Sequence, residues 1–161
     1  MKLRFVAGTG IISQAIIAQS KTAMPFTPSH VEAVSADGLS YIGAHISGGI
    51  QSRPKDYDAG QFAHELFLEP VPNVTDHYCQ DQMFDLFMKT KIGEPYDWHA
   101  IVGFIIPEHF HTPNTAICSA VCTLALRACG WLQWPVAAPA HLISPRDLLL
   151  MISARMEVPG I

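Results

Sequence analysis

Short apolar strands separated by glycine-containing turns limit residues 29–53 to an antiparallel arrangement. Residues 29–34 alternate in polarity, as a half-buried strand does, and Asp37-Gly38 is typical of a tight hairpin turn. Residues 39–46 return as a second strand, and Gly48-Gly49 leads into a possible third strand at residues 50–53. The pattern predicts an antiparallel meander.

The rest of the chain mixes strand and helix signals, which indicates an α+β fold. Strands are predicted at residues 2–7 and 62–72, and helices at residues 11–20, 76–89 and 115–128. A last helix is predicted from Pro145 to about Arg155, because Ser144 has the position of a capping residue. In the helix at 76–89, apolar residues recur at helical spacing and predict the buried face; they are Cys79, Met83, Leu86 and Phe87.

Composition indicates one compact domain spanning residues 1–161. The chain has 161 residues, of which 49% are hydrophobic and 15% charged. A formal net charge of -4 without basic runs argues against nucleic acid as a partner, and no stretch has the apolar length of a transmembrane segment. Residues 1–18 have a faint signal-peptide outline, but Gly8 and Gly10 interrupt it, so no cleaved signal is expected and localisation stays open.

Cys118 is the strongest candidate for a reactive group. It lies where a polar loop gives way to an apolar helical run, so its thiol is expected at a helix N-terminus. Unpaired backbone N–H groups and the helix dipole stabilise a thiolate there. Cys122 and Cys129 continue the same helix and are expected in the core. Because three of the four cysteines share one helix, free thiols are expected.

A histidine close to Cys118 would make the thiol a nucleophile. His30 begins a predicted strand, and His45 lies on the neighbouring hairpin strand, close enough for its ring to bind the far nitrogen of His30. His109-x-His111 has a spacing that could bind zinc on a strand, but it lies in a proline-flanked loop with no obvious third ligand. No metal or cofactor is therefore expected.

Several short motifs together resemble the NlpC-type papain-fold cysteine hydrolases. In the order in which they occur, they are Ser29-His30-Val31-Glu32, Asp37-Gly38, Tyr41-Ile42-Gly43-Ala44-His45, Gly48-Gly49, Gly93-Glu94-Pro95-Tyr96-Asp97-Trp98 and Cys118-Ser119. In the unpermuted family the histidine strand follows the cysteine. The order found here is similar to the circularly permuted, YiiX-like branch, over roughly residues 26–130.

The resemblance implies a permuted papain-like fold, in which a small antiparallel sheet packs on the cysteine-bearing helix and the active cleft lies between them. It implies a thiolate on Cys118, His30 as base and then acid, and Tyr96 beside the cysteine. The chain departs from the family at Gly43, where the third polar residue usually lies. His45, on the same strand face, is the preferred replacement, and Glu32, which shares a face with His30, is the alternative.

The reaction implied is hydrolysis of a peptide or amide bond through a thioacyl enzyme, with peptidoglycan as the default substrate of a bacterial or phage member. One alternative is a lipid acyl-chain hydrolase or acyltransferase, for which Phe104, Ile105, Ile106 and Phe110 would line an apolar cleft. The other is a non-catalytic phage-tail or assembly component that keeps the fold. A cell-wall target would imply delivery by a virion or a secretion apparatus.

Overall fold

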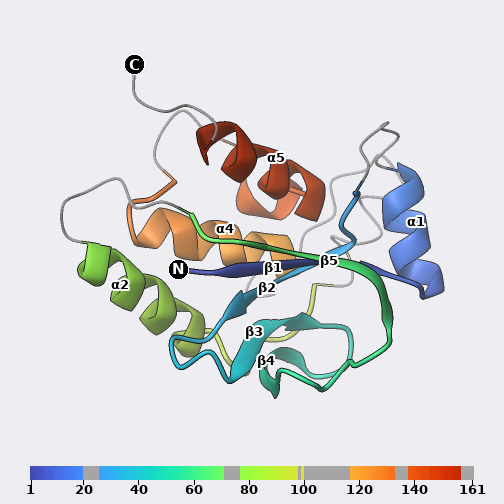
Figure 1. Cartoon of the computed structure of the whole chain (residues 1–161), viewed down its shortest axis with the longest axis horizontal. Coiled ribbons are helices and arrows are strands. Elements are labelled where there is room, and N and C mark those ends of the chain that lie inside the picture. The colour runs from blue at the N-terminus through green and yellow to red at the C-terminus, as the bar shows by residue number, and fades with distance from the viewer. Residues whose placement is uncertain (20–25, 71–76, 98, 100–116, 133–137, 157–161) are drawn as a thin grey trace.

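The computed structural model describes residues 1–19, 26–70, 77–97, 99, 117–132 and 138–156. In these residues an antiparallel sheet of five strands packs against α-helices (Figure 1). The strands are β1 (Leu3–Gly8), β2 (His30–Val34), β3 (Ser40–His45), β4 (Gly49–Pro54) and β5 (Phe62–Leu68). The helices are α1 (Ile11–Gln19), α2 (His77–Thr90), α4 (Cys118–Ala128) and α5 (Pro145–Met156), with a short 3-10 turn, η1, at Ala140–Leu142.

The strand order is β4-β3-β2-β1-β5, and every neighbouring pair is antiparallel. The β2–β3–β4 meander is the one predicted from the turn residues, and it sets Ala33 opposite Ile42 and Ala44 opposite Ile50. β1 pairs with β2 through Val6 and His30. The start of β2 therefore lies in the interior of the sheet.

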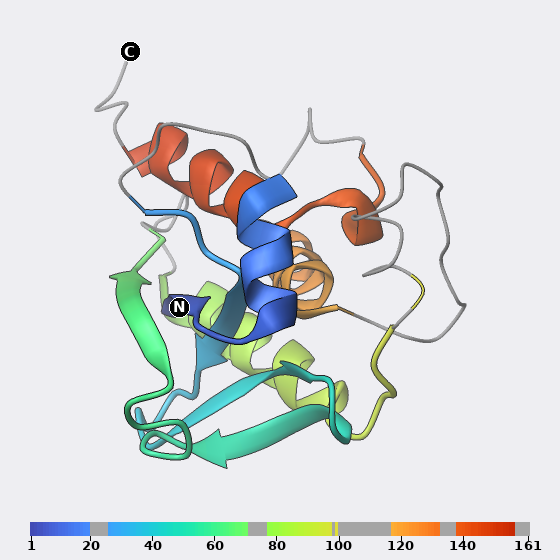
Figure 2. The same cartoon turned by 90° about the vertical axis from the view of Figure 1, so that its right-hand side faces the viewer.

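Helix α4 packs against β2 and β3, and α2, α5 and η1 pack against α4 (Figures 1 and 2). The core between sheet and helices contains Phe5, Val31, Ile42, Val121, Leu126, Trp131, Leu148 and Ile152. The predicted α+β fold, with an antiparallel sheet packed on the cysteine-bearing helix, is confirmed. None of the described helices has the length and apolar character needed to cross a bilayer.

The predicted cap of the last helix is confirmed. Ser144 Oγ accepts a hydrogen bond of 3.1 Å from the Asp147 backbone N–H, and Asp147 Oδ2 accepts one of 3.1 Å from the Ser144 N–H. This reciprocal pair is a capping box, which satisfies two donors at the start of α5.

The predicted buried face of α2 is wrong by one residue. Cys79 is exposed, and Met83 and Leu86 are 46% and 63% exposed. Gln80, Phe84 and Met88 are buried instead. Both sets repeat at helical spacing, so periodicity alone did not decide which one faces α4.

Candidate active site

Cys118 is the first residue of α4, as predicted. The residue before it, Ile117, has extended backbone and supplies no capping side chain. The sulfur accepts hydrogen bonds from the backbone N–H groups of Val31 and Ser119. Burial raises the pKa of Cys118, but the charge of His30, its hydrogen bond and these two N–H groups outweigh burial and lower it. The site therefore favours the thiolate.

His30, the first residue of β2, is the hydrogen-bond partner of Cys118. Burial lowers the pKa of His30, but the negative charge on Cys118, the hydrogen bond to it and Glu32 raise it to about 10. The two pKa shifts belong together: the His30 imidazolium stabilises the Cys118 thiolate, and the thiolate stabilises the imidazolium. This is the form in which a cysteine acts as a nucleophile.

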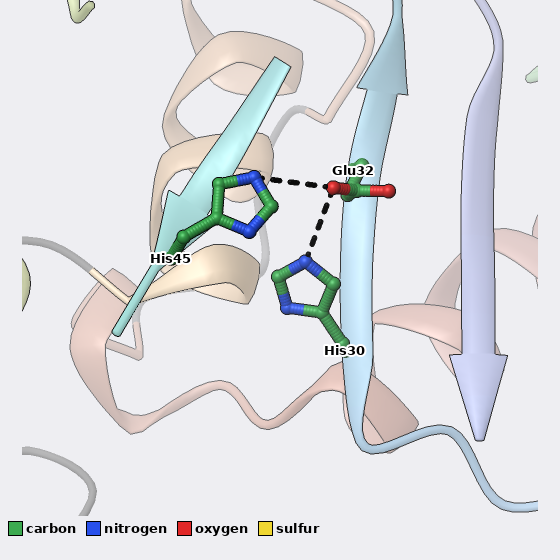
Figure 3. Close-up of side chains that lie close together, drawn as sticks. All are labelled: His30, Glu32 and His45. Carbon is green, nitrogen blue, oxygen red and sulfur yellow. Dashed lines mark ion pairs between the residues drawn. The ribbon is translucent and has the colours of Figure 1, made fainter. Parts of the chain in front are cut away.

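Glu32 lies between the two histidines that the sequence singled out (Figure 3). Its Oε1 is 3.4 Å from His30 Nε2 and 3.3 Å from His45 Nε2, and its side chain is 0% exposed. Neither Nε2 has a hydrogen bond of good geometry, so these are ion-pair contacts and not well-aligned hydrogen bonds. His30 and Glu32 share one face of β2, while Val31 and Ala33 on the other face pack in the core.

Two further residues hold the Glu32 carboxylate. Tyr57 donates a hydrogen bond of 2.7 Å to Oε1, and Arg4 Nη1 donates one of 3.1 Å to Oε2. Arg4 also binds both oxygens of Asp58, at 2.7 and 3.3 Å. Burial raises the pKa of Glu32, but its contacts with His30, Tyr57 and His45 lower it to about 2. Glu32 is therefore an anion at every pH at which the protein is expected to work.

His45 contacts the same oxygen of Glu32 as His30 does. The ring centroids of the two histidines are 5.4 Å apart, and each ring directs Nε2 at Glu32 Oε1 (Figure 3). Burial and the charge of His30 lower the pKa of His45 to about 4, so His45 is neutral near pH 7. Of the two candidates for the residue that orients His30, Glu32 is therefore the one that carries a charge at the His30 ring.

Burial raises the pKa of the Tyr96 hydroxyl, and the nearby Cys118 thiolate raises it further. Together with His30, Tyr96 lines a pocket of about 340 Å³ that α1, the β3–β4 turn and Tyr57 enclose. Cys118 is 4% exposed and does not line this pocket. His30 and Tyr96 are therefore the residues of this group that reach the pocket.

The same three side chains form a possible metal centre. His30, Glu32 and His45 each offer one ligand atom, and these atoms lie within 4.8 Å of one another. Two imidazole nitrogens and one carboxylate oxygen are a donor set suited to zinc or ferrous iron. The other zinc candidate, His109-x-His111, and the apolar residues Phe104, Ile105, Ile106 and Phe110 lie outside the described residues.

The remaining cysteines separate into two kinds. Cys122 and Cys129 are buried core residues, as predicted, and all four thiols are free. Burial, and then the charges of Cys118 and Glu32, raise the pKa of Cys122 well above the ordinary value. Cys118 and Cys122 are one helical turn apart and oppositely shifted, because His30 and two backbone N–H groups lower the pKa of Cys118 and do not act on Cys122.

Sequence reasoning missed Arg4, Tyr57 and Asp58. A usable signal existed for Arg4, because an arginine inside an apolar strand must be buried with a partner. Tyr57 and Asp58 follow Arg53 and Asp56 in a segment with a proline and several charges, a pattern typical of a solvated turn. In the structure that turn brings Tyr57 and Asp58 over the polar face of the sheet, and Asp58 is 2% exposed.

No model of a known protein family matches the chain, and no curated protein matches it closely enough to indicate a relative. The chemistry of the site is therefore argued from its geometry.

Proposed function

We propose that the protein is a cysteine hydrolase of the permuted papain-like type that cleaves an amide bond through a thioacyl intermediate. One observation carries the proposal: a cysteine at a helix N-terminus is hydrogen-bonded to a histidine, and a fully buried glutamate lies on the far side of that histidine. A thiolate, an imidazolium and an orienting carboxylate are the groups that acyl transfer by cysteine requires.

Each residue has a defined step. The Cys118 thiolate attacks the amide carbonyl carbon, and the carbonyl electron pair moves to oxygen. As the tetrahedral intermediate collapses, the carbon–nitrogen bond breaks and His30 gives its proton to the leaving amine. Neutral His30 then removes a proton from water, which attacks the thioester, releases the acid and restores the thiolate. The Cys118 N–H and the Tyr96 hydroxyl are the candidate donors to the oxyanion.

Glu32 serves as the positioning residue in this scheme. It directs the His30 ring toward Cys118 and stabilises the imidazolium, while Arg4 and Tyr57 keep its carboxylate ionised and fixed. His45 packs beside the same carboxylate, with its Nε2 3.3 Å from Oε1.

The first test compares the thiols by alkylation. Cys118 is expected to react with iodoacetamide faster at neutral pH than the exposed Cys79, and Cys122 is expected to stay unlabelled. His30→Gln should abolish the advantage of Cys118. Because the sulfur is only 4% exposed, equal or slower labelling of Cys118 would mean that substrate cannot reach it, and the proposal would fail.

The second test is turnover. The wild-type chain is incubated with peptide amides, peptidoglycan fragments and acylated lipids, and Cys118 is examined for an acyl adduct by mass spectrometry. An adduct from a peptide or muropeptide, absent in Cys118→Ala, supports amide hydrolysis. An adduct from the lipid alone would favour the acyl-chain alternative. No adduct and no product with any substrate would favour an assembly component.

A metal-dependent enzyme is the second candidate, favoured by the donor set of His30, Glu32 and His45. The two candidates respond oppositely to metal. A thiol hydrolase keeps its activity in a chelator and is inhibited by zinc, which would occupy the groups that orient His30. Loss of activity in chelator, with recovery on adding zinc and retention in Cys118→Ala, would establish the metal enzyme instead.

A further inference from the structure

The pocket beside His30 contains a cation that the proposed reaction does not use. Arg53 on β4 lines this pocket together with His45, Tyr57 and the β3–β4 turn. Its charge acts on the ring of His45, which places the guanidinium close to the His30–Glu32–His45 cluster.

Neutral groups hold the guanidinium in the pocket wall. Arg53 Nε donates 2.9 Å to Gln51 Oε1, and Nη2 donates 3.3 Å to the Ser47 carbonyl oxygen. The guanidinium carbon lies 5.0 Å from the centre of the Tyr57 ring, a cation–π contact. Among the described residues no carboxylate lies within ion-pair distance of Arg53, so its charge is fixed in place without an anionic partner.

The one acidic residue that lines the same pocket is bound by another cation. Both oxygens of Asp58 accept hydrogen bonds from Arg4, which also binds Glu32 and Glu65. Among the described residues no acceptor binds Nη1 of Arg53, so these donors remain for a ligand. A guanidinium presents N–H groups in a fixed fork that matches a carboxylate.

We propose that this pocket binds a carboxylate of the substrate through Arg53, so that the enzyme selects amides with an acidic residue next to the scissile bond. This inference rests on the proposed function for its reaction, but the binding site itself does not depend on turnover. A pocket of about 340 Å³ is at the small end of ligand sites and fits a single side chain better than an extended chain.

Binding is tested in Cys118→Ala, which keeps the pocket but cannot react. Two amidated dipeptides, Ala-Glu-NH2 and Ala-Gln-NH2, differ only in the charge of one side chain. Titration calorimetry is expected to show at least about tenfold tighter binding of the glutamate peptide. Adding Arg53→Gln should remove this preference, and Arg53→Lys should retain part of it because a lysine keeps the charge without the fork.

Lys55→Gln is the matched control, since Lys55 is an exposed cation two residues away that does not line the pocket. It should leave the preference unchanged. Equal binding of the two peptides, or no measurable binding of either, overturns the inference. In the wild-type chain, cleavage of both peptide amides at equal rates would remove the carboxylate site while the hydrolase stands. A charge preference in Cys118→Ala without any turnover in the wild type would support the carboxylate site and overturn the proposed hydrolase.

Discussion

Gly43 and Glu32 occupy adjacent positions on β3 and β2, and the glycine makes room for the glutamate. A Cβ atom on residue 43 would lie 2.9 Å from Glu32 Cγ, closer than real Cβ contacts come. The Glu32 side chain thus occupies the space that a side chain at position 43 would fill.

We expect Gly43→Ala to displace Glu32 and lower kcat/KM by at least about tenfold, because His30 would lose its fixed carboxylate. The strain should also cost about 1–3 kcal/mol of the free energy of unfolding. Gly10→Ala is the matched control, because a Cβ there meets nothing within 4 Å. Hydrolysis assays and urea denaturation of both variants test this, and full activity in Gly43→Ala would show that Glu32 has no positioning role.

Isosteric variants can separate the contributions of Glu32 and His45, the two candidates for the residue that orients His30. Glu32→Gln removes the charge beside His30 and is expected to lower kcat/KM by about 100-fold or more. His45→Gln leaves the Glu32 carboxylate beside His30 and is expected to cost less than about tenfold. The KM should change little in either variant if both act on chemistry. A larger loss in His45→Gln than in Glu32→Gln would return the role to His45.

The sequence was informative where one residue controls local structure and weak where several segments meet. The turn glycines gave the meander, and the apolar run after Cys118 gave the helix whose first residue carries the thiol. Neither pattern could show that Arg4 binds both Glu32 and Asp58, because those contacts join two strands and a turn across 54 positions of sequence. The sequence left His45 and Glu32 as alternatives because each lies on a suitable strand face. The structure brings both to His30, and the choice between them stays a prediction.

The shifted pKa values predict an unusual pH profile for hydrolysis. The reactive form has a Cys118 thiolate and a His30 imidazolium, so activity should rise as Cys118 loses its proton, below the ordinary thiol pKa. Since the pKa of His30 is raised from 6.5 to about 10, the imidazolium persists through neutral pH and activity should fall only as pH rises through about 10. Rates measured from pH 4 to 11 test this.

Glu32→Gln supplies the control for that profile. Removing the carboxylate takes away one of the causes that raise the pKa of His30, so the alkaline limb should move to lower pH. The ultraviolet absorbance of the thiolate, corrected with Cys118→Ala, reports the acid limb independently of turnover. Activity that rises with a single ionisation near 6.5 would mean that a neutral imidazole deprotonates a neutral thiol, and the preformed ion pair would be excluded.

Arg4 is expected to carry much of the stability of the polar face of the sheet. Its side chain is 5% exposed and binds Glu32 and Asp58, which are 0% and 2% exposed. Arg4→Met leaves two buried carboxylates without their cation and should lower the free energy of unfolding by about 3–5 kcal/mol at pH 7. Urea denaturation measures this, and Lys2→Met just before the same strand, which removes an exposed pair with Glu69, should change little.

The loss of stability in Arg4→Met should depend on pH, whereas a loss of packing alone would not. In the wild type the pKa of Glu32 is lowered from 4.5 to about 2, so its contribution to stability is complete above pH 4.5 and disappears as pH falls through 2. Without Arg4 the carboxylates should take up protons at higher pH, and the stability difference between Arg4→Met and the wild type should narrow on acidification. Asp58→Asn combined with Arg4→Met should recover part of the loss at neutral pH. A difference that stays constant with pH, and a double variant no more stable than Arg4→Met, would mean that Arg4 acts through its packing between Tyr41 and Phe62 and not through its charge.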